Sequence, residues 1–213
     1  MAFRNSAITK EILDQLTPLD VLQDFIDGNN RFIKDEVHTI NHKALIYQTT
    51  TLQFPKAIVL SCIDSRVPVE LIFDQAIGDI FVARIAGNFE NTDILGSMEY
   101  SCKIIGSKLI YVLGHENCGA IKAACDNVQL GNITSMLKNI MPAVKYTSEV
   151  DNVLGEISSS NDNFVTKTVE NNVRLTMDRI REKSAILNEM EAHGEIKIVG
   201  GVYNLSTGKV KLL

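Results

Sequence analysis

The amino-acid sequence predicts an α/β protein with a mostly parallel central β-sheet flanked by helices. The first observation is a set of continuous apolar runs, typical of strands buried on both faces, at residues 57–62, 80–84, 109–113 and 196–199. The second is that helical patterns separate these runs, and strands that alternate with helices favour a parallel sheet. The third is the tail, residues 202–213, where Ser206-Thr207-Gly208 stands between two extended stretches and predicts a C-terminal antiparallel edge strand.

Residues 1–50 precede the first strand and are predicted to form an N-terminal helical arm. Within the arm, residues 18–35 form an amphipathic pattern, with Leu22 and Phe25 on one apolar stripe. Thr17 is suited to cap this helix, and Pro18 is tolerated in its first turn. A second short helix is expected at residues 43–48.

Helical patterns after the first strands cover residues 93–105, 119–126 and 162–190, the last with breaks. The chain has 213 residues, and it contains no internal repeat and no low-complexity linker. This length is suited to one domain, so we expect residues 1–213 to form a single domain that includes the arm.

Composition excludes several classes of protein. The formal net charge is −5 and the pI is about 5.4, which argues against a nucleic-acid-binding protein. No apolar run is long enough to span a membrane, and the first residues lack the apolar stretch of a secretory signal. The expectation is therefore a cytoplasmic protein. In a reducing compartment its four cysteines are buried thiols, metal ligands or catalytic groups rather than disulfides.

Residues suited to binding a metal follow two of the predicted strands. Cys62-Ile63-Asp64-Ser65-Arg66 ends the first strand, and Gly114-His115-Glu116-Asn117-Cys118-Gly119 ends the third. Because sites in open parallel sheets form beyond the carboxyl ends of the strands, Cys62, His115 and Cys118 are expected to meet there. Two thiolates and one imidazole suit zinc and leave a fourth position open, as in catalytic zinc sites. We expect one Zn²⁺ per chain.

Asp64 and Arg66 follow the first predicted ligand directly. An arginine beside an aspartate keeps the carboxylate ionised and orients it. Two other interpretations stay open: a Cys62–Cys118 disulfide, and a phosphatase-like thiolate at Cys62 paired with Arg66. The phosphatase design needs a longer, glycine-bearing loop of amides than the three residues present. Cys102 and Cys125 lie in helical patterns and are expected to be small buried hydrophobic side chains.

With these motifs the sequence resembles the β-class carbonic anhydrases. Their two signatures are similar to residues 62–68 and 115–119, and residues 81–88 are also similar to a stretch of the family. The resemblance implies a zinc enzyme that hydrates carbon dioxide to bicarbonate, with ligands Cys62, His115 and Cys118 and a catalytic pair, Asp64 and Arg66. It also implies a plant-like substrate pocket formed by Gln53, Phe81, Tyr100 and Gly119, without the tryptophan of the other active-site type.

The same resemblance implies a homodimer or homotetramer with the pocket built across two chains and an arm that wraps the partner. Two other functions compete with this one. A carbon disulfide hydrolase-like enzyme would share the fold and the zinc ligands but admit a different substrate. A non-catalytic zinc-binding protein would need a fourth protein ligand in place of an exchangeable water.

Overall fold

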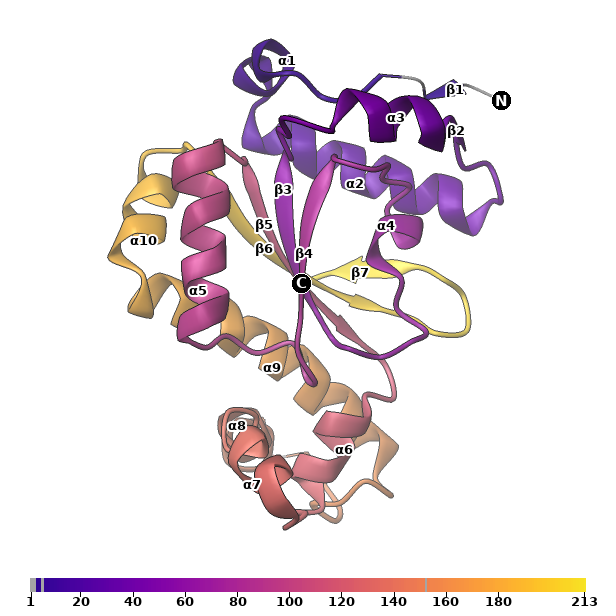
Figure 1. Ribbon diagram of the computed structural model, residues 1–213. Helices are drawn as coiled ribbons and strands as arrows, with labels where there is room; N and C mark the ends of the chain where they lie inside the picture. The colour runs from indigo at the N-terminus through magenta and orange to yellow at the C-terminus, as the bar shows by residue number, and fades with distance from the viewer. Residues whose placement is uncertain (1–2, 5, 152) are drawn as a thin grey trace.

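The computed structural model describes residues 3–4, 6–151 and 153–213, and a five-stranded sheet forms its centre. The strand order is β4-β3-β5-β6-β7, with every neighbouring pair parallel except β6 and β7 (Figure 1). The strands are β3 (Ala57–Ser61), β4 (Ile80–Arg84), β5 (Leu109–His115), β6 (Lys197–Tyr203) and β7 (Val210–Leu212). The predicted fold class, including the antiparallel edge strand, is confirmed.

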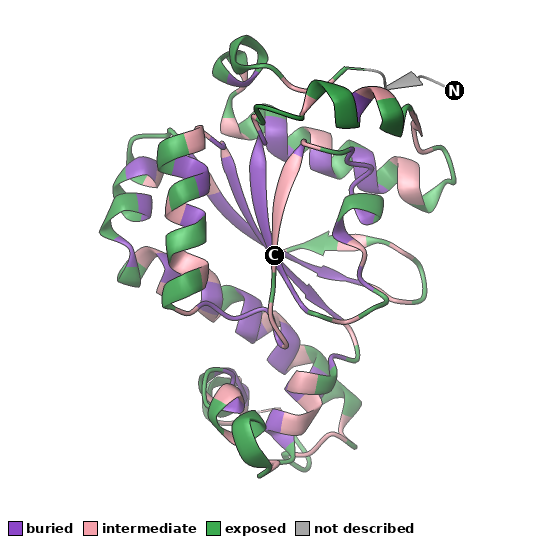
Figure 2. Ribbon diagram, in the orientation of Figure 1, coloured by how far each residue is buried: buried purple, intermediate pink, exposed green. Residues whose placement is uncertain are grey.

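Side chains of the central strands point alternately to two cores. On β3, Ile58 and Leu60 join one core, whereas Ala57 and Val59 join the other. Burial on both faces is the reason that the strands read as continuous apolar runs (Figure 2). Strand β4 differs, because it lies at the edge of the sheet and its residues are only partly buried.

The helices form layers on the two faces of the sheet (Figure 1). They are α1 (Lys10–Gln15), α2 (Pro18–Ile33), α3 (His42–Gln48), α4 (Val69–Ile72), α5 (Thr92–Glu99), the π-helix η1 (Tyr100–Ile105), α6 (Gly119–Cys125), α7 (Gly131–Leu137), α8 (Met141–Glu149), α9 (Asp162–Lys183) and α10 (Ala185–Ala192). Two short strands, β1 (Phe3–Arg4) and β2 (Thr39–Ile40), pair in parallel away from the main sheet.

The predicted helices are present, with two differences. The pattern at 93–105 is α5 followed by the π-helix η1, which ends at Gly106 in a left-handed conformation. The pattern at 162–190 is divided at Ser184, whose side chain caps α10. Helices α1, α4, α7 and α8 were not predicted, since none exceeds nine residues and short helices carry weak periodicity.

Helix α2 begins with the capping expected at Thr17. The Thr17 hydroxyl accepts a hydrogen bond from the Asp20 amide, and the Asp20 carboxylate accepts one from the Thr17 amide. Its apolar face packs on the chain's own sheet, where the Phe25 ring lies 4.6 Å from Phe73 and 5.7 Å from Tyr111 between centroids. This part of the arm therefore forms a layer of its own subunit.

No helix in the described part of the chain combines the length and apolarity needed to cross a bilayer.

Candidate metal centre

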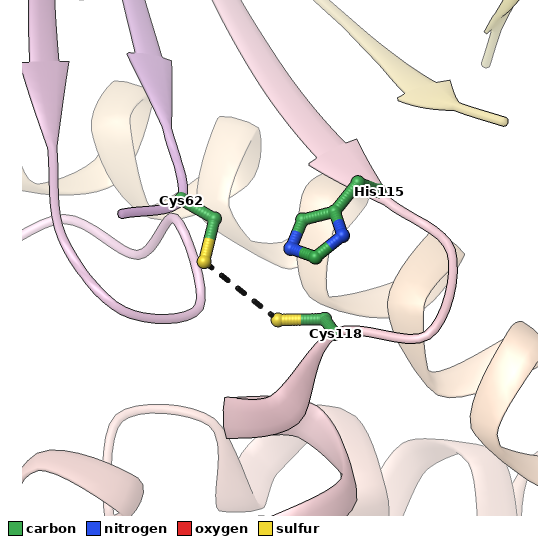
Figure 3. Close-up of side chains that lie close together, drawn as sticks. All are labelled: Cys62, His115 and Cys118. Atoms are coloured by element: carbon green, nitrogen blue, oxygen red, sulfur yellow. Dashed lines mark hydrogen bonds between the residues drawn. The ribbon is translucent and has the colours of Figure 1, made fainter. Parts of the chain in front are cut away.

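Two neighbouring strands bring the three predicted ligands together. Cys62 directly follows β3, His115 is the last residue of β5, and Cys118 precedes the first turn of α6. Their ligand atoms all lie within 4.8 Å of one another, and all three residues are buried. The side chains point into one space between the strand ends and α6 (Figure 3). In the described residues, no fourth histidine, cysteine or carboxylate belongs to this cluster.

The imidazole of His115 is oriented to offer one nitrogen to a cation. Its Nδ1 lies 2.8 Å from the carbonyl oxygen of Glu116, which can accept only from a protonated nitrogen. The proton is thereby held on Nδ1, and the lone pair of Nε2 faces the two cysteines. Nε2 is buried and has no hydrogen-bond partner among the described residues, so a cation would satisfy an otherwise unpaired atom.

The two sulfur atoms are spaced for a shared metal ion and not for a disulfide. The Sγ atoms of Cys62 and Cys118 lie 3.9 Å apart. Two zinc–sulfur bonds of about 2.3 Å at a tetrahedral angle place the sulfurs about 3.8 Å apart. A disulfide requires about 2.05 Å. All four cysteines are free thiols, so the disulfide interpretation is wrong for this structure.

The pKa values of the two thiols are shifted in opposite directions. Contact with the Cys118 thiol holds the pKa of Cys62 below its ordinary value, and the Gly87 amide, which donates to Sγ of Cys62, adds to this effect. The pKa of Cys118 is raised because that thiol donates to Cys62 and is buried. A cation that binds both sulfurs must displace the protons they carry, so metal binding at this cluster depends on pH.

Asp64 and Arg66 form a paired arrangement beside the cluster. Arg66 donates from Nε to Oδ1 at 2.9 Å and from Nη2 to Oδ2 at 2.7 Å, and its backbone amide also donates to Oδ1. These bonds hold the pKa of Asp64 below its ordinary value, and the nearby His115 adds a smaller effect. Oδ2 of Asp64 lies 3.9 Å from Nε2 of His115, so an ionised carboxylate borders the metal cluster.

Two residues that the motif analysis did not include as site residues support the loop of Cys62 and Asp64. Arg84 ends β4 and donates from Nε to the carbonyl of Cys62 at 2.9 Å and from Nη2 to that of Asp64 at 2.6 Å. The amide of Gly87 donates to Sγ of Cys62 at 3.4 Å. Arg84 could have been found from the sequence, because it stands at the carboxyl end of a strand. The bond from Gly87 could not, because it is made by a backbone amide.

Three of the predicted pocket residues line two hollows, and the fourth, Gly119, directly follows Cys118 at the start of α6. Phe81 and Tyr100 line a hollow of about 730 Å³ beside β4 and α5, with ring centroids 6.4 Å apart. Gln53 lines another hollow, of about 410 Å³, which it shares with Tyr100. Neither hollow has Cys62, His115 or Cys118 among its lining residues.

The remaining predictions concern small residues and the other thiols. A Cβ at Gly119 would meet no atom within 4 Å, so close backbone approach is not the reason for this glycine, and it leaves open space at the start of α6. Cys102 and Cys125 are buried in the core, and their burial raises the pKa of both thiols. The expectation that they are buried hydrophobic residues is confirmed.

Comparison with known proteins gives one consistent result. The model of the carbonic anhydrase family matches residues 57–210. Carbonic anhydrase 2 of Mycobacterium tuberculosis (strain CDC 1551 / Oshkosh) is 33% identical over 197 residues, covering 87% of this chain and 88% of the relative. A Coccomyxa β-carbonic anhydrase, solved with acetazolamide, is 26% identical with a TM-score of 0.70, covering 92% and 84% of the two chains. A tetrameric β-carbonic anhydrase from Sordaria macrospora shares the fold at 21% identity, with a TM-score of 0.70 and coverage of 91% and 97%.

Proposed function

The chain belongs to the β-class carbonic anhydrase family, and on this premise we propose that it hydrates carbon dioxide to bicarbonate and a proton with a zinc ion held by Cys62, His115 and Cys118. The observation that carries the proposal is the meeting of two sulfurs and one unpaired imidazole nitrogen beside an ionised carboxylate. When bound, zinc supplies a Lewis acid that brings the pKa of a coordinated water to about 7.

Asp64 is proposed to accept a hydrogen bond from the attacking water. This bond would turn a lone pair of the water oxygen toward carbon dioxide. The two bonds from Arg66 leave this carboxylate ionised and fix the plane of its oxygens. The same two bonds favour a site whose fourth metal position is left to water. Asp64 would have to break its bonds to Arg66 before it could occupy that position as a ligand. Arg84 holds the carbonyls of Cys62 and Asp64, so the ligand and the carboxylate keep one relative position.

The substrate pocket is proposed to form where two copies of the chain meet, with Gln53, Phe81, Tyr100 and Gly119 lining it. Strand β4 supports this, because it is a sheet edge whose apolar residues remain partly exposed. Tyr100 is half exposed and lines the same hollow as Phe81 and Ile94, and contiguous apolar surface of this kind marks contacts between proteins. A homodimer or homotetramer is therefore proposed, which sedimentation of the wild type and of Phe81→Arg would test.

A cytoplasmic location is also proposed. Two of the four cysteines belong to the metal cluster, and the other two are buried and unpaired. Such thiols suit a reducing compartment. Cell fractionation with an antibody to the protein would test the location.

That residues 1–213 form one domain remains a proposal as well, which a single cooperative unfolding transition would support.

The proposed activity is tested by stopped-flow hydration of carbon dioxide at mildly alkaline pH, with zinc measured in the same sample. We expect fast turnover with one zinc per chain, loss of turnover after treatment with a chelator, and its return on addition of zinc. Protein that holds one zinc per chain but shows no turnover above buffer would contradict the proposal. Turnover of carbon disulfide in the same assay would separate the hydrolase alternative.

The non-catalytic alternative is not favoured by the site. A structural zinc normally has four protein ligands, and the cluster in the described residues has three. A storage or structural role also gives no reason for the paired hydrogen bonds between Asp64 and Arg66.

A further inference from the structure

The loop between β4 and α5 holds a peptide group against one predicted metal ligand. The Gly87 amide donates to Sγ of Cys62, and Gly87 has a φ of +85°, in the left-handed region. A Cβ at this position would lie 2.4 Å from Cδ1 of Ile140 and 3.3 Å from Cβ of Ala120. The peptide is thus confined between the start of α6 and the residue that precedes α8.

The carbonyl of the same glycine is held from a distant part of the chain. Asn172, in the middle of α9, donates from Nδ2 to the carbonyl of Gly87 at 2.8 Å. Asn172 is 1% exposed, and its Oδ1 has no hydrogen-bond partner among the described residues. A buried amide that leaves its oxygen unpaired loses free energy, so its placement is not explained by hydrogen bonding within α9.

Close packing of α9 on the sheet fixes the distance of Asn172 from strands β5 and β6. A Cβ at Gly114 or at Gly200 would lie 2.6 Å or 2.4 Å from a methyl group of Val173, the next residue of α9. The two glycines therefore let the helix approach β5 and β6 closely at this point. A second connection lies about two to three turns beyond Asn172, where Arg179 and Lys183 pair with the buried Glu90 of the same loop.

We propose that Asn172 is a positioning residue of the metal centre, which acts through the Gly87 peptide on the thiolate of Cys62. Asn172 holds the carbonyl of Gly87, and the wedged glycine then presents its amide to Sγ. A hydrogen bond to a thiolate stabilises its negative charge and restricts its direction, as supporting groups around metal sites generally do. The inference rests on the proposed metal centre and extends it to a residue 85 positions away from the loop.

The test uses the Asn172→Leu variant. Leucine keeps the approximate shape of the side chain and removes its hydrogen bond to the carbonyl of Gly87. The matched control is Asn171→Leu. Asn171 is also buried on α9, but it donates to Thr147 and Asp151 and does not reach the loop. Full-length wild type and variants are stripped of metal and titrated with cobalt(II) alone, in competition with a chelator, while the sulfur-to-cobalt charge-transfer band is recorded.

We expect Asn172→Leu to bind cobalt on the order of tenfold more weakly than wild type. Its charge-transfer band should move to longer wavelength, because a sulfur that has lost a hydrogen bond gives up its electron more readily. Asn171→Leu should lower stability but keep the wild-type band and affinity. The Asn172→Ala variant should reproduce the shift, and it serves as the measurement if the leucine variant does not fold.

Identical cobalt affinity and band in Asn172→Leu, Asn172→Ala and wild type would overturn the inference. Equal shifts in the Asn171 and Asn172 variants would overturn it too, since they would indicate a general effect of loosening α9. Failure of wild-type protein to show any thiolate band with cobalt would instead overturn the proposed metal centre.

Discussion

Arg66 binds both carboxylate oxygens of Asp64 although only one residue separates them in the chain. A bidentate pair at this spacing requires the backbone to turn, and the amide of Arg66 closes that turn on Oδ1. The side chain of Arg66 is 55% exposed whereas that of Asp64 is 16% exposed. The arginine therefore covers the carboxylate from the solvent side and leaves its other edge toward the metal cluster.

Replacing Asp64 by asparagine should lower turnover without removing metal. The amide keeps one acceptor oxygen but carries no negative charge and cannot hold both bonds from Arg66, and the loss of a supporting group beside a metal site costs about tenfold to a hundredfold. Stopped-flow hydration and metal analysis on the same sample would check this. Full turnover in a metal-loaded Asp64→Asn enzyme would show that Asp64 has no catalytic role.

The pH profile should not contain a titration of Asp64 in the working range. The pKa of Asp64 lies below its ordinary value of 3.8, so the carboxylate stays ionised at any pH above that value and loses its charge only in stronger acid. A fall of kcat/KM between pH 9 and pH 6 must therefore come from another group. We expect the Asp64→Asn profile to be lower than the wild-type profile and still to fall over this range; disappearance of the fall in the variant would contradict this assignment.

Cys118→Ala should remove most bound metal and most activity, because it deletes one of three ligands. Cys125→Ala is the matched control, since Cys125 is also buried and ends the same helix α6 without belonging to the cluster. The control should keep its metal and lose only the packing of one sulfur atom. Metal content by mass spectrometry distinguishes the two, and equal metal in both variants would exclude Cys118 as a ligand.

Removing the metal should destabilise the protein as well as inactivate it. A ligand present at a thousand times its Kd stabilises the folded state by about 4 kcal/mol. We therefore expect a lower Tm after chelation and recovery on adding zinc, but no recovery with magnesium, which prefers oxygen ligands. An unchanged Tm would mean that the three ligands hold no ion in the folded protein.

Gly28→Ala should destabilise the chain although it lies within α2, where alanine is ordinarily the better residue. A Cβ there would lie 2.0 Å from the backbone oxygen of Phe73, so α2 would have to move away from the sheet. We expect a loss of about 2 kcal/mol or more in urea unfolding. Asn30→Ala, at an exposed site on the same helix, should change stability by less than about 0.5 kcal/mol.

Much of the fold could be predicted because its signals are local. A strand buried on both faces needs apolar residues at nearly every position, so β3 and β5 can be recognised in the sequence as continuous apolar runs. Their carboxyl ends must meet at one edge of a parallel sheet, and this placed Cys62, His115 and Cys118 together in advance. The short helices α7 and α8 escaped prediction because their burial depends on packing against α6 and α9.

The sequence by itself predicted the sheet, the meeting of Cys62, His115 and Cys118 at its edge and the pairing of Asp64 with Arg66, since each follows from strand periodicity, from the ends of parallel strands or from near neighbours in the chain. Only the tertiary structure decided that the two sulfurs stand 3.9 Å apart and that Asn172 reaches Gly87. It also decided that Phe81 and Tyr100 line one hollow together. These contacts join residues far apart in sequence, and their geometry depends on how closely whole helices approach the sheet.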